Sequence, residues 1–100
     1  MTEETLIQRL VETEEEEGYP RTEWQTIETT RSFALPVGQR ELLRAQQGGY
    51  EVESRRFLPV GTDVTVEDAL WVDDARWEVT GIPEFTEELS AHVEVYLRAR

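Results

Sequence analysis

The stretch DALWVDDARWEVTGIP, from Asp68 to Pro83, contains the clearest structural signal in the chain. Two apolar runs flank a polar tetrad, and in both runs large apolar residues recur at every second position. This period of two places one face of a strand on a core and the other face in water. The pair Asp73-Asp74 tolerates the positive φ of a tight turn. The stretch therefore predicts a β-hairpin, in which Gly81 marks a bulge or a close backbone approach.

Three further segments have the composition or alternation of strands. Thr22–Leu35 is rich in threonine and aromatic residues, and Pro36 ends it because proline cannot donate to a β-ladder. Tyr50–Phe57 and Ser90–Arg98 alternate apolar with polar residues, the second more regularly than the first. We expect Trp24, in the first of these segments, to lie in the core or to plug one end of a barrel.

Two segments have other patterns. In Thr5–Glu12 the apolar residues favour a short amphipathic helix, but the same run suits a strand that is apolar on both faces, and periodicity leaves both open. Gln39–Gln47 contains good helix formers and is followed by Gly48-Gly49, a plausible helix stop. We expect a short helix or an ordered loop there, projecting from the sheet.

These elements together predict an all-β fold in one domain, residues 1–100, of about five to six antiparallel strands. Strands of this spacing, with turn signals between them, are typical of a small β-barrel or sandwich. The short helix or long loop, residues 36–49, is inserted between the second and third strands. No internal repeat or linker divides the chain.

The charge of the chain excludes several partners. Its 22 acidic residues outnumber 10 basic ones, all arginine, for a net charge of −12. An acidic surface is a poor match for a nucleic-acid groove or for an anionic membrane. No apolar run approaches the ~20 residues that span a bilayer, and the N-terminus lacks the features of a secretion signal. We therefore expect neither a membrane partner nor specific DNA binding.

No catalytic, cofactor-binding or metal site is predicted. The chain has no cysteine, and its one histidine, His92, is expected at the surface, whereas a metal site needs three or four convergent ligands. No serine sits in a nucleophile elbow and no glycine-rich phosphate loop occurs. The run Glu14–Glu17 is read as a solvated acidic turn, since it lacks the alternating ligands and inner glycine of a calcium loop. The chain is therefore not expected to be an enzyme.

Short motifs follow one another in a characteristic order along almost the whole chain. They are Leu6–Glu12, Gly18-Tyr19-Pro20, Trp24 with Ile27, Pro36, Arg40-Glu41, Ala45-Gln46, Tyr50–Val52, Arg55–Phe57, Asp68–Leu70, Trp77–Val79 with Gly81-Ile82, and Val93–Val95. In this order they resemble the phage head–tail joining family, the small head-closure or stopper proteins of long-tailed bacteriophages. The resemblance implies a strand rather than a helix at Thr5–Glu12.

The resemblance also implies a function and a set of partners. A structural virion protein of this kind is made in the host cytoplasm and sits at the head–tail junction. There it forms a small-barrel ring of roughly six or twelve copies, below the portal or adaptor ring. The ring closes the channel after genome packaging and presents a docking face to the tail terminator or tail tube. Packaged DNA passes through it without specific binding.

Two groups of site residues follow. In relatives the excursion corresponding to 36–49 reaches the channel and helps to plug it. The residues implied to line the closure here are Gln39, Arg40, Gln46, Gln47, Gly48 and Gly49. The residues expected at partner interfaces are Glu14, Glu15, Glu16, Glu17, Tyr19, Arg55, Arg56 and Phe85. Arg55 and Arg56 are expected to be surface or interface groups that pair with nearby glutamates, each exposed pair worth only ~0–1 kcal/mol.

Two questions stay open at this point. The acidic residues could line a lumen that repels DNA phosphates, or the run Glu14–Glu17 could face a basic patch on a neighbouring ring. The alternative functions are a tail terminator or another neck subunit of the same virion and, more distantly, an acidic DNA mimic that inhibits a nucleic-acid enzyme.

Overall fold

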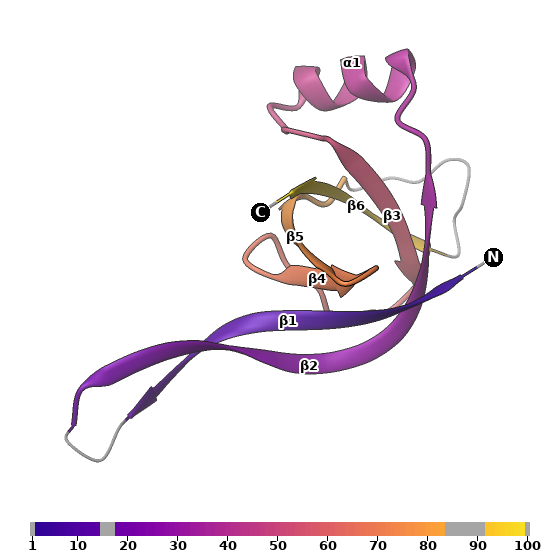
Figure 1. The fold of residues 1–100 in the computed structure, drawn as a ribbon. Helices are drawn as coiled ribbons and strands as arrows, with labels where there is room; N and C mark the ends of the chain where they lie inside the picture. The colour runs from indigo at the N-terminus through magenta and orange to yellow at the C-terminus, as the bar shows by residue number, and fades with distance from the viewer. Residues whose placement is uncertain (1, 15–17, 84–91, 100) are drawn as a thin grey trace.

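The computed structural model describes residues 2–14, 18–83 and 92–99 (Figure 1). In these ranges the chain forms six strands and one short helix. They are β1 (Glu3–Glu14), β2 (Pro20–Leu35), α1 (Gln39–Gln47), β3 (Ser54–Pro59), β4 (Ala69–Val72), β5 (Ala75–Gly81) and β6 (His92–Ala99). The all-β prediction and the helix between the second and third strands are both confirmed.

The six strands close into an antiparallel barrel in the order β1-β2-β3-β6-β5-β4. Closure depends on a short seam between the first and fourth strands, where Leu6, Ile7 and Gln8 pair with Trp71, Leu70 and Ala69. Full closure leaves the body of the sheet with no edge that could pair with another chain. The N-terminal run is therefore a strand, and the helix that its spacing also allowed is not formed.

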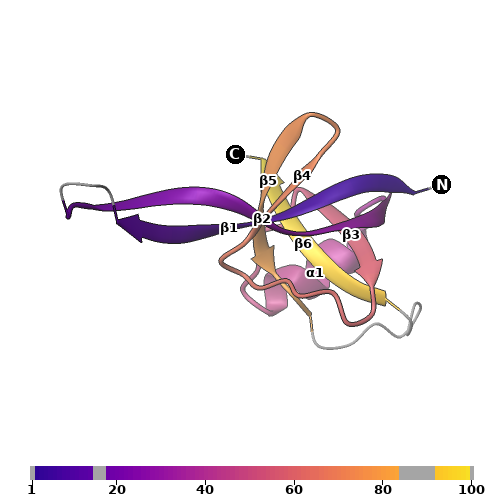
Figure 2. The ribbon, with the colours of Figure 1, turned by 90° about the horizontal axis from the view of Figure 1, so that it is seen from below.

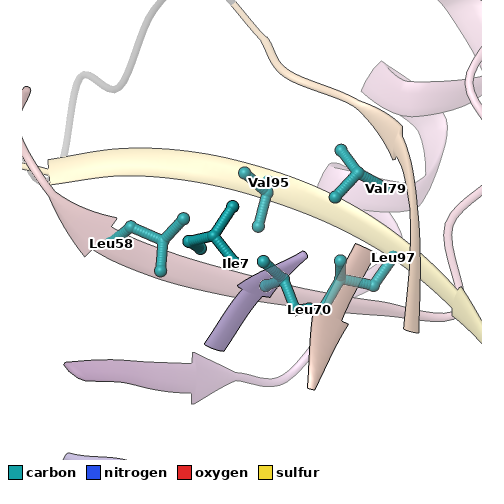
Figure 3. Close-up of a cluster of buried hydrophobic side chains, with 6 residues drawn as sticks. All are labelled: Ile7, Leu58, Leu70, Val79, Val95 and Leu97. Carbon is teal, nitrogen blue, oxygen red and sulfur yellow. The ribbon is translucent and has the colours of Figure 1, made fainter. Parts of the chain in front are cut away.

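The core is a small apolar cluster inside the barrel (Figure 3). Each strand except β2 contributes to it, and every member is at most 1% exposed. The members are Ile7, Leu58, Leu70, Val79, Val95 and Leu97. Because side chains alternate across a strand, each strand needs only one or two such residues to fill an interior this narrow.

The β4–β5 hairpin forms as predicted. Val72 pairs with Ala75, so the loop contains only Asp73 and Asp74, with φ of 54° and 58°. Two successive residues at positive φ make the turn whose twist matches that of the strands. Both readings of Gly81 are also confirmed. The register of β5 against β6 shifts between Val79 and Gly81, and a Cβ there would run into the ring of Tyr50.

The first two strands extend far beyond the barrel as a twisted two-stranded ribbon (Figures 1 and 2). All of β1 pairs with β2, from Glu3 opposite Ser32 to Glu14 opposite Pro20. The third strand joins β2 only from Phe33 to Leu35, and β4 joins β1 only at the seam. We call the projecting part, residues 9–14 and 20–25, the arm. It gives the molecule its elongated shape, 51 × 28 × 23 Å.

The expectation that Arg55 and Arg56 are surface groups is wrong. They lie in β3 and are only 8% and 6% exposed: Arg55 lies against Pro36 and Glu41 at the start of α1, and Arg56 lies against Ser32 and Glu3. Their pairing with glutamates is confirmed. The Nη1 of Arg55 donates to Glu94 at 2.9 Å, and the Nη2 of Arg56 donates to Glu3 at 2.9 Å. Arg56 also donates from Nη1 to the Ser32 hydroxyl at 3.0 Å.

Three smaller expectations also need correction. Strand β3 begins at Ser54 rather than at Tyr50, because the Tyr50 N–H donates to the Ala45 carbonyl at 2.8 Å and so completes the end of the helix. Trp24 lies half-buried on the outer face of the ribbon, with its ring 4.9 Å from the Arg76 guanidinium, and not in the core. His92 is half-buried rather than at the surface.

Truncation of a core side chain at the seam should be costly. Leu70→Ala removes a fully buried side chain whose strand closes the barrel, so we expect the free energy of unfolding to fall by about 2–5 kcal/mol. Urea denaturation measures the change. Val60→Ala, at an exposed position outside the strands, is the control and should change stability by about 0.5 kcal/mol or less. Equal effects of the two substitutions would contradict this account of the core.

Candidate functional site

The excursion at residues 36–49 projects from one end of the barrel as helix α1 (Figure 1). The helix ends at Gly48, as the sequence predicted. Ala45 is its only buried residue, whereas Leu42 and Leu43 are 40% and 56% exposed. A helix that turns two leucines to solvent contributes little apolar surface to its own core, so its sequence is not explained by the folding of this chain alone.

All six residues predicted to line the channel closure are exposed at this end of the molecule. They are Gln39, Arg40, Gln46, Gln47, Gly48 and Gly49. Residues three and four apart share a helix face, so Leu43 lies between Gln39 and the pair Gln46-Gln47. The excursion therefore presents amide groups, one guanidinium and exposed leucine side chains together.

One buried cation holds the start of the excursion against the barrel. Arg55 donates from Nε to the Pro36 carbonyl at 3.1 Å and lies 3.5 Å from the Glu41 carboxylate, while its Nη1 binds Glu94 on β6. Hydrogen bonding to its own backbone N–H, together with the nearby Arg55 charge, lowers the pKa of Glu41. Glu41 also reaches the backbone of Gly38, the residue that precedes the helix. Arg55 therefore fixes where α1 begins.

Tyr50 anchors the other end of the helix. Its N–H completes the hydrogen bonding of the last turn, and its ring packs edge-on to Tyr96 at 5.4 Å between centroids. The same ring lies against Gly48 and Gly81, where a Cβ would collide with it. Gly49 has φ of +79°, which favours glycine. Both ends of the excursion are thus fixed, while its exposed face is left clear.

The residues predicted for partner interfaces are dispersed. Glu14 and Tyr19 lie at the tip of the arm, and Tyr19 is 68% exposed. Figures 1 and 2 show this tip far from α1. Arg55 and Arg56 are inside the molecule. The remaining predicted interface residues, Glu15, Glu16, Glu17 and Phe85, lie outside the described residues.

The structure adds a cluster that the sequence reading missed. On the outer face of the barrel the Arg76 guanidinium lies 4.9 Å from the ring centre of Trp24 and 5.8 Å from that of Trp71. Its Nε donates to the side chain of Gln8 at 3.0 Å. Leu10, opposite Trp24 on β1, is exposed beside this cluster. Tryptophan and arginine are enriched in the centres of protein interfaces.

A signal for this cluster was available in the sequence. In the predicted hairpin Trp71 alternates with the inward-facing residues, and a two-residue turn at Asp73-Asp74 places Arg76 directly opposite it. The contribution of Trp24 was not predictable in this way, because it requires the register of β1 against both β2 and β4.

The described residues contain neither a metal cluster nor a membrane-spanning helix. No group of three histidine, aspartate or glutamate side chains among them converges as a metal site would require. The only helix in these ranges, nine residues long, is far too short to cross a bilayer. Two surfaces in the described part of the chain are distinctive: the exposed face of α1, and the tryptophan–arginine cluster that joins Trp24 of the arm to the β4–β5 hairpin.

Comparison with known proteins supports the fold. No family model matches the chain, and a search of curated proteins gives no match. Among solved structures, the chain is similar to the solution structure of protein SF1141 from Shigella flexneri 2a, a structural-genomics target. The two are 17% identical, the match covers 97% of this chain and 90% of the other, and the TM-score is 0.71. At this level of identity the likeness shows a shared fold.

Breaking the ion pair beneath the excursion should destabilise the protein. Glu94→Gln leaves the buried Arg55 charge with only the more distant Glu41 carboxylate. We therefore expect a loss of about 3 kcal/mol in the free energy of unfolding, measured in urea. Glu67→Gln removes a carboxylate at an exposed position and is the matched control, with an expected change of about 0.5 kcal/mol or less. A neutral result for Glu94→Gln would show that the pair does not hold the excursion.

Proposed function

We propose that this protein is a structural subunit of a tailed-phage neck. In this role it forms a homo-oligomeric ring at the head–tail junction, closes the portal channel after genome packaging and offers a docking face to the tail. The small barrel with an excursion between β2 and β3 suits this role, and so does the order of motifs that resembles the head–tail joining family. The protein acts by position and contact and carries out no catalysis.

The observation that carries the proposal is the construction of α1. The helix is held at both ends, by Arg55 and by Tyr50, yet only Ala45 is buried and two leucines face solvent. A segment that is fixed in place but exposes apolar side chains suits contact with other copies of itself. Where several excursions converge on a ring axis, their leucines and glutamines would pack together and narrow the channel.

The charge of the chain is consistent with a channel that DNA must traverse. A net charge of −12 gives the surface a potential that repels phosphates, so DNA can slide past without being held. A DNA mimic is less well supported. It needs carboxylates arrayed on one face, whereas several acids here are committed to internal ion pairs. These include Glu3, Asp68 and Glu94.

The alternative within the same virion is a tail terminator or another neck subunit. Such a protein shares the ring architecture and differs in the ring to which it binds. Co-sedimentation of the purified protein with adaptor rings and with tail tubes separates the two functions. Binding to the adaptor favours the closure role, and binding to the tail tube alone favours the terminator.

Removal of the excursion should release packaged DNA. We expect particles that carry the protein without Gln39–Gln47 to lose genome before tail joining, because the barrel is retained while the channel stays open. The measurement is nuclease-resistant DNA per particle in a strain that makes no tails. Full retention of DNA by particles that carry the deletion variant would contradict the closure mechanism.

A milder substitution guards against misfolding of the deletion. Leu42→Asp with Leu43→Asp changes two exposed helix residues and should lower DNA retention without altering the fold. Val60→Asp with Val66→Asp makes the same change of charge at two exposed apolar residues outside the helix. This control should retain DNA at the wild-type level.

Assembly of the ring should respond to salt. Acidic subunits repel one another at low ionic strength, and this repulsion is screened as the Debye length falls from about 30 Å at 0.01 M salt to about 8 Å at 0.15 M. We expect the oligomer measured by analytical sedimentation to grow as salt is raised at constant protein concentration. Dissociation with rising salt would indicate instead that attractive ion pairs join the copies.

A further inference from the structure

One face of the arm continues the surface on which the tryptophan–arginine cluster lies. Residues paired directly across two strands share a face, so Leu10 lies beside Trp24, its partner on β2. Every second residue of β1 lies on the same side, which adds Gln8, Glu12 and Glu14. Leu10, Glu12 and Glu14 are exposed. We call the surface formed by these five residues the docking face.

Arg76 supplies a cation to the docking face from the β4–β5 hairpin. Its guanidinium lies against the two tryptophan rings of the cluster, and its Nε donates to the Gln8 side chain at 3.0 Å. Stacking uses the flat face of a guanidinium and leaves the N–H groups at its rim able to bind a carboxylate. None of the ion pairs in the described ranges includes Arg76, Glu12 or Glu14. The docking face therefore carries charges of both signs that this part of the chain does not neutralise.

The opposite face of the arm has a different arrangement of charge. It carries Arg9, Arg21 and Glu23, whose cross-strand partners all alternate with those of the docking face. Arg9 is bound there to Asp63 and Asp68. The charges of the arm are thus divided by face. The docking face has two carboxylates toward its tip and one cation at its base.

The spacing of these charges makes the docking face complementary to itself. Gln8 and Glu12 each lie two residues from Leu10, which is about 7 Å in either direction along a strand. Consider two arms placed face to face, related by a two-fold axis that crosses the strands at Leu10. Glu12 of each copy then lies over Gln8 of the other, where the Arg76 guanidinium is held. Leu10 and Trp24 of the two copies meet at the axis.

Neither a purely acidic nor a purely basic partner matches this face. An acidic segment attracted to Arg76 would also meet Glu12 and Glu14, and a basic segment attracted to those carboxylates would meet Arg76. Like charges brought together at an interface are destabilising. A second copy instead sets opposite charges against each other on both sides of the axis. Each copy has a net charge of −12, but charges farther apart than the Debye length, about 8 Å at 0.15 M salt, are largely screened.

We infer that the docking face binds a second copy of this chain across a two-fold axis at Leu10. Leu10 and Trp24 form the apolar centre of the contact, and two ion pairs between Arg76 and Glu12 flank it. Such a contact closes at two copies. The inference goes beyond the proposed function and does not depend on it, because Figure 1 shows α1 far from the arm and the dimer leaves the helix exposed.

Reversal of the facing charges tests the contact. The dimerisation constant of the full-length protein is measured by analytical sedimentation at 0.15 M salt. Glu12→Arg and Arg76→Glu each set like charges opposite each other, so we expect Kd to rise by about tenfold or more in either variant. Glu67→Arg makes the same change of charge as Glu12→Arg at an exposed position outside the strands. This control should dimerise at least as tightly as the wild type.

A mixture of the two variants identifies the occupant. When Glu12→Arg and Arg76→Glu proteins are combined in equal amounts, each introduced charge meets an opposite charge on the other variant. We therefore expect a heterodimer with a Kd near that of the wild type, although neither variant dimerises well alone. Recovery of this kind requires that the two positions face each other between copies. Unchanged circular dichroism of each variant shows that the loss in the single variants is not due to misfolding.

A cross-linking measurement locates the axis. The chain has no cysteine, so Leu10→Cys introduces a single thiol at the proposed centre of the dimer. A short bismaleimide reagent should join two copies of this variant much faster than two copies of Val60→Cys, whose thiol is exposed outside the strands.

Several results would overturn the inference. They are a wild type that stays monomeric at every concentration tested, association that persists unchanged in both single variants, a mixture that fails to recover the dimer, and equal cross-linking at positions 10 and 60. The persistent association would indicate a contact through another surface, such as α1. None of these results bears on genome retention by the α1 variants.

Discussion

The fold depends on a three-residue seam. Where Leu6, Ile7 and Gln8 pair with the fourth strand, β1 is shared between the ribbon and the barrel. Ile7 sits at the centre of this seam and is fully buried in the core. Beside it, Arg9 donates from Nε and Nη2 to the two carboxylate oxygens of the buried Asp68, at 2.8 and 2.9 Å. A bidentate pair of this kind fixes geometry as well as charge, so it sets where the barrel ends and the arm begins.

Local patterns in the sequence predicted the local structure well. The β4–β5 hairpin, its Asp73-Asp74 turn and the limits of α1 were all deducible, because turn chemistry and helix stops act over a few residues. The reach of the arm was not deducible. It depends on how much of β1 and β2 the third and fourth strands cover, which is a property of register between distant segments. The sequence alone predicted the strands but not the residue at which each strand leaves the barrel.

The same contrast between local patterns and long-range register explains which parts of the candidate site could be predicted from the sequence. The excursion and its exposed residues followed from composition. The burial of Arg55 did not, because a strand with arginines in sequence reads as solvent-facing unless the covering elements are known. Here the Glu94 carboxylate on β6 neutralises the Arg55 charge, and the Pro36 carbonyl accepts a hydrogen bond from the same side chain. A residue that seemed available to a partner is in fact the internal support of the helix that a partner would meet.

One consequence of the ribbon concerns how its length can vary. Every member of the apolar core lies outside the arm, and the last one on β1 is Ile7. Removing two residues from each strand beyond Arg9 would draw in the tip by about 7 Å and keep every remaining side chain on its original face. The length of the arm can therefore change in steps of two residues per strand without altering the apolar core. Such changes would match the position of the tip to whatever it contacts.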